Sequence, residues 1–410
     1  MKLCIFMRIL FVSNNYIGEN CATGDMLNNL FSGFDDIKIL QYILTPDYAK
    51  LDISNVSVLS HNDFNIFQRI ITRLKASKYK SSVGLKFRKQ AIRFNNYLNE
   101  TFTYNISKPT TKAINDFNPE AIYTLGGDIK VLRMSVKIAE KLDIPIILHS
   151  MDDFYHFKFT SRDILSRIAR KRFLNACSHA YRRCRYGLAI GPTMADEYSK
   201  EFGISFDWAM NCCSPDVTQV PQLAKSPRKI IFSGGLHGGR ADKLYNFAEI
   251  IERTEYFMEI FTDNAGYDSN INRFEKFKNV SINRYVPKSE QIRNLRSADL
   301  LLHVESDDPK YIQYFRLSMS TKIPEYINAQ IPILCIGSKS IASVSYIEQT
   351  HIGEVAENIS DVHTALARLE NLEFRKIIRK NQIQLLKERF SKTQMRKHLL
   401  FVLEQNISNK

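Results

Sequence analysis

Short apolar runs alternate with amphipathic segments along most of the chain. The apolar runs have the length and composition of buried strands, and the segments between them follow a helical period. In the first half of the chain we expect strands at residues 8–14, 37–44, 56–60, 121–125, 145–149 and 187–190. Helices are expected at residues 23–31, 129–142 and 161–182, with further helices between residues 64 and 104. Strands and helices in alternation predict a parallel sheet with helices on both faces.

The alternation restarts at Lys229, after a segment that contains Pro215, Pro221 and Pro227. Strands are expected there at residues 230–234, 257–262, 280–285, 300–304, 331–336 and 352–356. Helices are expected at residues 240–253, 269–277, 289–297, 319–329, 341–348 and 361–370, followed by a basic helical tail at 374–405. The pattern therefore predicts an α/β protein with an N-terminal domain (1–213), a linker (214–228), a C-terminal domain (229–372) and a helical tail (373–410).

The composition is that of a soluble globular protein. The chain has 410 residues, of which 44% are hydrophobic and 24% charged, so it can bury two cores. Its seven cysteines form no Cys-x-x-Cys pair, and an odd number argues against a disulfide framework. The apolar start is interrupted by Arg8, and no other window approaches 18 apolar residues. We therefore expect a reducing, cytoplasmic location without a membrane span.

The net charge of +14 calls for an anionic partner. No acidic residue occurs from Phe64 to Phe94, where lysines and arginines are interleaved with apolar residues, and a second basic run covers Arg162 to Arg185. A solvated helix face is the simplest explanation, but basic amphipathic helices favour an anionic membrane surface. Nucleic acid is not expected as a partner, because no helix-turn-helix, zinc or RNA-recognition signature accompanies the charge.

The stretch from Phe315 to Gly337 carries the first candidate site. Ser320, Thr321, Lys322 and Glu325 cluster at the start of the helix expected at 319–329. Hydroxyls, unpaired backbone N–H groups and the positive end of a helix dipole attract an anion, and a carboxylate one turn later can hold two sugar hydroxyls. The stretch therefore suggests a nucleotide site, although an ordinary capped helix packed by its apolar residues would have the same pattern.

A glycine-rich loop opens the C-terminal domain. Gly234 and Gly235 follow the expected strand 230–234, and Arg240 and Lys243 begin the helix after the loop. Glycines leave backbone N–H groups free to meet phosphate oxygens, and two basic side chains three residues apart lie on one helical face. The loop matches neither the P-loop nor the dinucleotide-binding fingerprint. The alternative is a plain turn followed by a solvated basic helix start.

These two stretches resemble the nucleotide-sugar site of GT-B glycosyltransferases, in particular glycosyltransferase family 4, in a variant that reads Ser-Thr-Lys-x-x-Glu-Tyr at residues 320–326. The resemblance implies two Rossmann-like domains that face each other across a cleft, with the last helix crossing back onto the first domain. It implies a retaining transfer and makes Glu325 the ribose ligand. The family usually has a second glutamate eight residues earlier, where this chain has Leu317, so Ser318, Ser320 or Thr321 would hold the donor sugar instead.

The chemistry predicted for this site needs no metal and no cofactor. Negative charge grows on the diphosphate leaving group, and Arg240 and Lys243 can stabilise that charge. The chain has no Asp-x-Asp clamp, and we expect the acidic run from Glu305 to Asp308 to be a solvated loop and not a metal site.

The N-terminal domain has candidate residues for the other side of the cleft. His149 ends an expected strand, where ligands bind in open α/β sheets, and the family has a histidine that faces the donor sugar at the matching position. A satisfied structural histidine is the alternative. Asp152 and Asp153 could orient acceptor hydroxyls or merely cap the next segment. Gly18 and Gly24 follow the first strand and would let the backbone approach an acceptor.

The sequence therefore predicts a retaining glycosyltransferase that uses a nucleoside-diphosphate sugar. The basic runs suggest a lipid-linked glycan as acceptor, in bacterial capsule, O-antigen or exopolysaccharide assembly on the inner face of the cytoplasmic membrane. A nucleotide-sugar 2-epimerase of the same fold is the first alternative, and a non-catalytic nucleotide- or polyanion-binding protein is the second.

Overall fold

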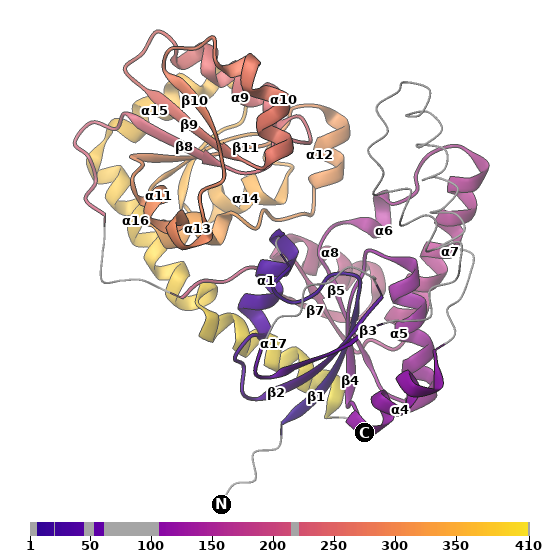
Figure 1. The fold of residues 1–410 in the computed structure, drawn as a ribbon. Coiled ribbons are helices and arrows are strands. Elements are labelled where there is room, and N and C mark those ends of the chain that lie inside the picture. Colours follow the sequence, from indigo (N-terminus) through magenta and orange to yellow (C-terminus); the bar gives the residue numbers. More distant parts are fainter. Residues whose placement is uncertain (1–5, 20, 45–52, 61–105, 215–220, 409–410) are drawn as a thin grey trace, which may run out of the picture. The chain divides into compact units, whose positions relative to one another are not determined.

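The computed structural model describes residues 6–19, 21–44, 53–60, 106–214 and 221–408 (Figure 1). The described chain divides into two compact units. The first contains the chain up to Ala209 together with the segment from His398, and the second runs from Met210 to Lys397. The acid-free stretch Phe64–Phe94 and the helices expected between residues 64 and 104 lie outside the described residues.

The first unit is built on a seven-stranded parallel sheet in the order β3-β2-β1-β4-β5-β6-β7. The strands are β1 (Met7–Ser13), β2 (Ile37–Ile43), β3 (Val56–Ser60), β4 (Ala121–Leu125), β5 (Ile146–Ser150), β6 (Tyr186–Ala189) and β7 (Ser205–Trp208). The described helices are α1 (Ala22–Phe31), α4 (Lys108–Phe117), α5 (Ile129–Leu142), α6 (Phe154–Phe157), α7 (Ile164–Tyr181) and α8 (Pro192–Phe202). This strand order is that of a doubly wound sheet, which confirms the predicted fold class.

The second unit is built on a six-stranded parallel sheet in the order β10-β9-β8-β11-β12-β13. The strands are β8 (Lys229–Ser233), β9 (Phe257–Thr262), β10 (Val280–Arg284), β11 (Leu300–Val304), β12 (Ile333–Ile336) and β13 (Gly353–Ala356). The helices are α9 (Arg240–Ile251), α10 (Asn264–Phe274), α11 (Gln291–Arg296), α12 (Pro309–Phe315), α13 (Ile323–Ala329), α14 (Ala342–Gln349), α15 (Val362–Glu370), α16 (Leu372–Leu385) and α17 (Lys392–Ile407), whose last residues belong to the first unit. Short 3₁₀ turns precede α11 and α15, and a π-helical segment (Leu386–Phe390) follows α16.

The inner strands are largely buried because both faces of each sheet are covered, whereas the edge strands β3 and β10 are partly exposed. All five residues of β11 are buried, and so are all five of β5. Strands covered on both faces appear in the sequence as continuous apolar runs, which is why the bounds predicted for β4, β9 and β11 are correct.

Several elements were not predicted. They are α4, α6, α8, α12 and β7. α12 has Pro309 in its first turn, and the Asp308 side chain accepts a hydrogen bond from the Lys310 N–H at 2.8 Å. An Asp at the N-cap followed by Pro at the first helical position is a helix-start signal, so this helix could have been found.

Several predicted helices have different bounds in the structure. α10 begins at Asn264 and not at Ser269. α13 begins at Ile323 and not at Met319, and Pro324 lies in its first turn. The predicted tail 374–405 is not one helix, because the π-helical segment ends at Phe390 and the extended Ser391 separates it from α17.

Candidate functional site

Four neighbouring strands of the second sheet end at the residues that form the candidate site. Gly234 follows β8, Asp263 follows β9, Tyr285 follows β10 and Glu305 follows β11. The strand order reverses between β8 and β11, and ligands of open α/β sheets bind at such a reversal, beyond the carboxyl ends of the strands. A ligand site is therefore expected at this edge of the sheet.

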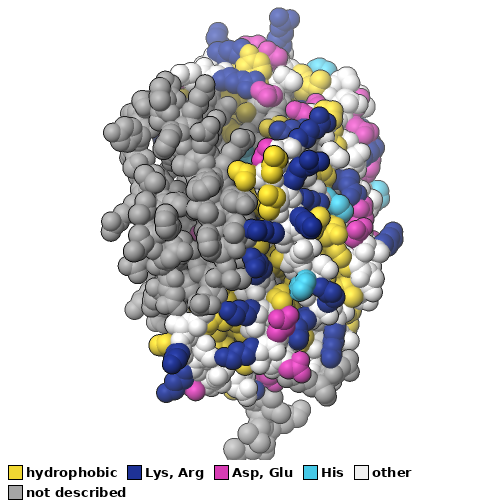
Figure 2. Space-filling model, turned by 90° about the vertical axis from the view of Figure 1, so that its right-hand side faces the viewer, with side chains coloured by type: hydrophobic (Ala, Val, Ile, Leu, Met, Phe, Trp, Pro, Cys, Tyr) yellow, Lys and Arg dark blue, Asp and Glu magenta, His cyan; other side chains and the backbone are white. Residues whose placement is uncertain are grey.

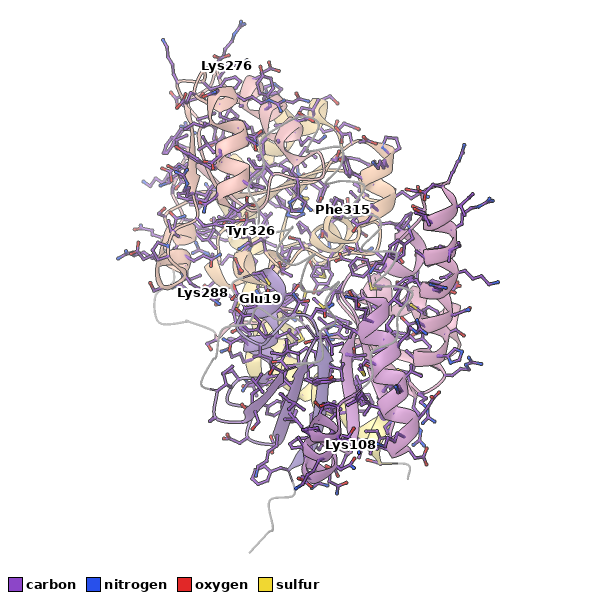
Figure 3. All side chains as sticks on the ribbon, turned by 45° about the vertical axis from the view of Figure 1, so that its right-hand side comes forward. Glu19, Lys108, Lys276, Lys288, Phe315 and Tyr326 are labelled. Atoms are coloured by element: carbon purple, nitrogen blue, oxygen red, sulfur yellow. The ribbon has the colours of Figure 1, made fainter. Side chains whose placement is uncertain are left out.

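The glycine-rich loop after β8 is packed tightly against α12. Gly238 and Gly239 have φ of +69° and +80°, which favours glycine. A Cβ at Gly238 would lie 2.8 Å from the Phe315 ring, and one at Gly239 would lie 2.2 Å from Ser306 Oγ. Figure 3 labels Phe315 at the end of α12. These two glycines are thus required by the turn and by the packing of α12, and contact of the loop with phosphate stays a prediction.

Arg240, the first residue of α9, is held by Glu305 across the strand-order reversal. Its Nη2 donates to Glu305 Oε1 at 3.0 Å and to Oε2 at 2.8 Å, and its Nε donates to Val304 O at 3.3 Å. Its guanidinium also lies 4.9 Å from the centroid of the Phe315 ring. Only 2% of the Glu305 side chain is exposed. The expectation of a solvated loop from Glu305 to Asp308 is therefore wrong for Glu305, which the adjacent strands bury.

The Glu305 carboxylate stays charged although it is buried. Burial alone would raise its pKa, but the charge of Arg240, the nearby His303 and the hydrogen bonds from Arg240 outweigh burial and lower the pKa to about 2. His303 Nε2 lies 3.2 Å from Glu305 Oε1. The carboxylate therefore acts as a fixed negative partner for Arg240.

This shift predicts an acid-dependent loss of stability. A carboxyl with a lowered pKa stabilises the folded state above its unfolded value of about 4.5, and that contribution is lost as the pH falls toward 2. The difference in free energy of unfolding between the wild type and Glu305→Gln should shrink across this range, by at most about 1.4 kcal/mol per pH unit. Urea unfolding of both proteins from pH 5 to pH 3 measures it, and a constant difference would contradict the assignment.

Lys243, one turn after Arg240, also has an acidic partner. Its ammonium pairs with Asp307, and 2% of the Lys243 side chain is exposed against 56% of the Asp307 side chain. The two cations that the sequence predicts as diphosphate ligands do lie together at the start of α9. Each is already neutralised by a carboxylate from the segment after β11, which the sequence did not indicate.

Glu325, in the first turn of α13, accepts hydrogen bonds from three side chains. Lys322 Nζ lies 2.9 Å and Gln291 Nε2 lies 2.6 Å from Oε2, and Asn211 Nδ2 lies 3.4 Å from Oε1. The side chain of Glu325 is 20% exposed. Gln291 and Asn211 lie far from Glu325 in the sequence, so no local pattern could identify them. These contacts fix a carboxylate that solvent can still reach.

The backbone at the start of α13 is less open to an anion than predicted. The Ser320 N–H donates to Ser343 Oγ at 2.8 Å, and the Lys322 N–H donates to Ser320 Oγ at 3.4 Å. The Thr321 carbonyl accepts from Asn211 at 3.3 Å. The structure therefore brings Ser320, Thr321, Lys322 and Glu325 together, but these backbone donors already have partners. Phosphate binding at this point stays a prediction.

Two tyrosines complete this part of the site. Tyr326 Oη accepts from the Ser233 N–H at 3.0 Å and donates to Leu302 O at 3.1 Å, so it ties α13 to β8 and β11 (Figure 3). Tyr285 is 41% exposed, and Lys322 Nζ lies 5.5 Å from the centroid of its ring. Burial of the hydroxyl and the charges of Asp263 and Glu325 raise the Tyr285 pKa to about 12, while Arg240 lowers it. Tyr285 was not predicted, and its hydroxyl lies within electrostatic range of the site's charged groups.

His149 is an interior residue of the first unit. It is 0% exposed, its Nδ1 lies 2.5 Å from Tyr123 Oη, and its Nε2 lies 2.9 Å from Ala209 O. Burial lowers its pKa to about 4 although hydrogen bonds to Ala209 and Ala189 oppose the shift. The imidazole is therefore neutral near pH 7, with both nitrogens engaged inside this unit. Its predicted role toward a donor sugar stays a prediction.

Asp153 forms a buried cluster with two residues that the sequence did not indicate. Its Oδ1 accepts from Tyr198 Oη at 2.9 Å and lies 2.7 Å from His156 Nδ1. Asp153 is 2% exposed, whereas 34% of the His156 side chain is exposed. Asp152 is only partly buried. Of Asp153, Tyr198 and His156, only His156 has a side chain that is substantially exposed to solvent. Its imidazole is held in place by the Asp153 carboxylate.

Gly18 and Gly24 close a turn after β1. Gly18 has φ of +79°, and its N–H donates to Gly24 O at 3.0 Å. A Cβ at Gly24 would lie 2.2 Å from Glu19 O, so the backbone of the turn itself requires this glycine. Contact of either glycine with an acceptor stays a prediction.

Neither a metal cluster nor a membrane-spanning helix is found in the part of the chain that the structure describes. No group of three or more His, Cys, Asp or Glu side chains there is placed to hold a metal ion. No helix among those residues is both long and apolar enough to cross a bilayer.

Residues 230–400 match the family model described as the glucosyltransferase 3-like C-terminal domain. No curated protein sequence matches the chain. Among solved structures, Anabaena HepE in complex with UDP and glucose is 12% identical and has a TM-score of 0.61, over 97% of this chain and 99% of that one. The lipopolysaccharide outer core galactosyltransferase WaaB is 14% identical, with a TM-score of 0.55 over the same shares. UGT2 of Phytolacca americana, complexed with UDP-2-fluoroglucose and pterostilbene, is 11% identical. Its TM-score is 0.53, over 98% of this chain and 100% of that one.

At these identities the structural likeness shows the fold alone, and membership of glycosyltransferase family 4 stays a prediction. The two doubly wound parallel sheets agree with the fold of these glycosyltransferases over nearly the whole chain. The chain therefore has the GT-B fold, and its residues 230–400 are similar to the glucosyltransferase 3-like C-terminal domain.

Proposed function

We propose that the chain is a glycosyltransferase whose second unit binds a nucleoside-diphosphate sugar. The observation that carries this proposal is the arrangement of Arg240, Lys243 and Glu325 beyond the carboxyl ends of β8 and β11. Two cations can neutralise a diphosphate. The partly exposed Glu325 carboxylate is held in place and can accept hydrogen bonds from both ribose hydroxyls. The family model that matches this unit supports the same conclusion.

The proposed reaction breaks the bond between the anomeric carbon and the diphosphate oxygen. The electron pair leaves with the diphosphate, and the fixed charges of Arg240 and Lys243 stabilise it more as it becomes more negative. We propose a retaining transfer, in which the leaving phosphate accepts the proton of the acceptor hydroxyl on the same face of the sugar. No metal and no cofactor take part in this scheme.

A panel of UDP-, GDP- and ADP-sugars, incubated with the protein in the presence of EDTA, tests the proposal. We expect one donor to be slowly hydrolysed, or transferred to an added sugar acceptor, and NMR of the product should show the anomeric configuration of the donor. An epimerised donor would support the epimerase alternative. Binding of a nucleotide without any turnover would support the non-catalytic one, and an inverted product would refute retention.

No observation on the second unit favours the epimerase. That reaction needs carboxyl groups that can give and take protons, whereas Glu305 is bound to Arg240, and Glu325 is bound to Lys322 and Gln291. Asp263 accepts a hydrogen bond from the Gly266 N–H at 2.8 Å as the cap of α10. Each of these carboxylates is therefore engaged as an acceptor by groups of the protein itself.

For the acceptor we propose a lipid-linked glycan in bacterial surface polysaccharide assembly, reached from an anionic membrane surface. The basic run from Arg162 to Arg185 falls mostly on α7, where Ile164 is 73% and Leu165 40% exposed beside the exposed Arg167 and Lys171. Figure 2 shows Lys and Arg side chains gathered on the side of the molecule that includes α7. Apolar side chains next to basic ones suit the interface of an anionic leaflet.

Co-sedimentation with vesicles tests this acceptor proposal. Binding to anionic vesicles should exceed binding to neutral ones and should fall as salt rises, because screening shortens the reach of charges to roughly 8 Å at physiological ionic strength. Equal binding to both vesicle types, or tight binding to nucleic acid alone in a gel shift, would remove the membrane proposal and leave the donor site untouched.

A further inference from the structure

The two acidic residues that neutralise the start of α9 differ in their freedom to move. The Glu305 side chain is 2% exposed, its backbone N–H donates to Ile336 O at 2.9 Å, and both of its carboxylate oxygens accept from Arg240. The Asp307 side chain is 56% exposed and reaches Lys243 from the segment between β11 and α12. Separating Glu305 from Arg240 would require buried residues around them to move apart. The Asp307 carboxylate, in contrast, can rotate away from Lys243 into the solvent.

Lys243 needs an anion beside it whether or not a ligand is bound. Its side chain is 2% exposed, and an ammonium without a partner in such a place is costly. Asp307 can therefore leave Lys243 at low cost only if another anion replaces it. A phosphate oxygen has the required charge, and Arg240 stands one turn away with a fixed guanidinium that can meet a second phosphate group.

We propose that Asp307 is a resident counter-ion, which keeps Lys243 paired in the empty site and is displaced by an oxygen of a diphosphate. This rests on the proposed function, because it takes the diphosphate of the donor as the incoming anion. The exchange replaces one ion pair by another, so the buried ammonium is never left unpaired. After transfer, the returning Asp307 carboxylate competes with the nucleoside diphosphate for Lys243 and so aids its release.

The exchange has a measurable effect on affinity. The incoming anion must displace Asp307 from Lys243, so the free energy of the Lys243–Asp307 pair is subtracted from the free energy of binding. Removing the Asp307 charge removes this competition and should tighten binding about tenfold. The same substitution should lower the stability of the empty protein, since Lys243 loses its counter-ion.

Calorimetric titration with inorganic pyrophosphate tests the proposal without knowledge of the donor base or sugar. The variants are Asp307→Asn and, as a matched control, Asp308→Asn. Asp308 lies in the same segment, and its carboxylate caps α12 by accepting from the Lys310 N–H at 2.8 Å, which an asparagine oxygen can also do. We expect Asp307→Asn to bind pyrophosphate about tenfold more tightly than the wild type, and Asp308→Asn to stay within about twofold.

Thermal unfolding gives a second readout. Without pyrophosphate, Asp307→Asn should melt below the wild type, and saturating pyrophosphate should raise its melting temperature by more than it raises that of the wild type. Equal affinity in Asp307→Asn and the wild type, an equal gain in Asp308→Asn, or no pyrophosphate binding to any variant would each overturn the proposal. Tighter pyrophosphate binding by Asp307→Asn without turnover of any nucleotide sugar would instead support the counter-ion and refute the proposed function.

Discussion

Replacing Arg240 with methionine should lower the free energy of unfolding by about 3–5 kcal/mol at pH 7. The reason is that the Glu305 carboxylate, 2% exposed and ionised, would be left without the guanidinium that accounts for its low pKa. The double variant Arg240→Met/Glu305→Gln removes both charges and should recover most of this loss, because a neutral amide costs far less to bury than an unpaired carboxylate. Urea unfolding of the wild type, both single variants and the double variant measures the coupling.

Arg273→Met is the matched control for this cycle. Arg273 also pairs with a carboxylate, that of Asp242 at 2.6 Å, but 36% and 74% of the two side chains are exposed. Its loss should cost no more than about 1 kcal/mol. If Arg240→Met were no more destabilising than Arg273→Met, the buried pair would not hold this edge of the sheet. The folded double variant should still turn over a donor about 10²–10³-fold more slowly, because the leaving diphosphate has lost a fixed cation.

Replacing Glu325 with alanine should lower kcat/KM for the nucleotide sugar by roughly ten- to a hundredfold or more. The proposed ribose contacts are charge-assisted hydrogen bonds, each worth about 1.5–3 kcal/mol, and alanine removes them together with the acceptor for Lys322 and Gln291. Glu325→Gln keeps the shape and one acceptor oxygen and should lose less. Steady-state kinetics with the preferred donor gives the comparison.

Glu348→Ala serves as the control for the Glu325 substitution. Glu348 lies on α14 of the same unit and pairs with Lys339 at 2.5 Å, with 42% of its side chain exposed. Its removal should leave the kinetics unchanged. A folded Glu325→Ala protein with wild-type kinetics would show that the carboxylate does not touch the donor.

The order of strands and helices could be predicted from the sequence because it depends on local pattern. Strands buried on both faces are continuous apolar runs, and in the helices between them apolar residues recur about every 3.6 positions. The α/β class therefore follows without tertiary information. Some of the elements missed, such as α12, are short and carry their signal in a cap and a proline rather than in a period. Packing against the glycine-rich loop makes α12 part of the site, and no local pattern reports that contact.

The sequence by itself determined that basic, glycine and hydroxyl residues stand at the ends of strands, and that Glu325 opens a helix near them. Only the tertiary structure decided which of these groups have partners. Arg240 meets Glu305 because β8 and β11 are neighbours at the reversal of strand order, although 64 residues separate Arg240 from the carbonyl of Val304 that it also contacts. His149 is an interior residue whose two ring nitrogens contact the Tyr123 hydroxyl and the Ala209 carbonyl, both distant in the sequence. Ionisation and exposure depend on such long-range neighbours, and no local sequence pattern identifies them.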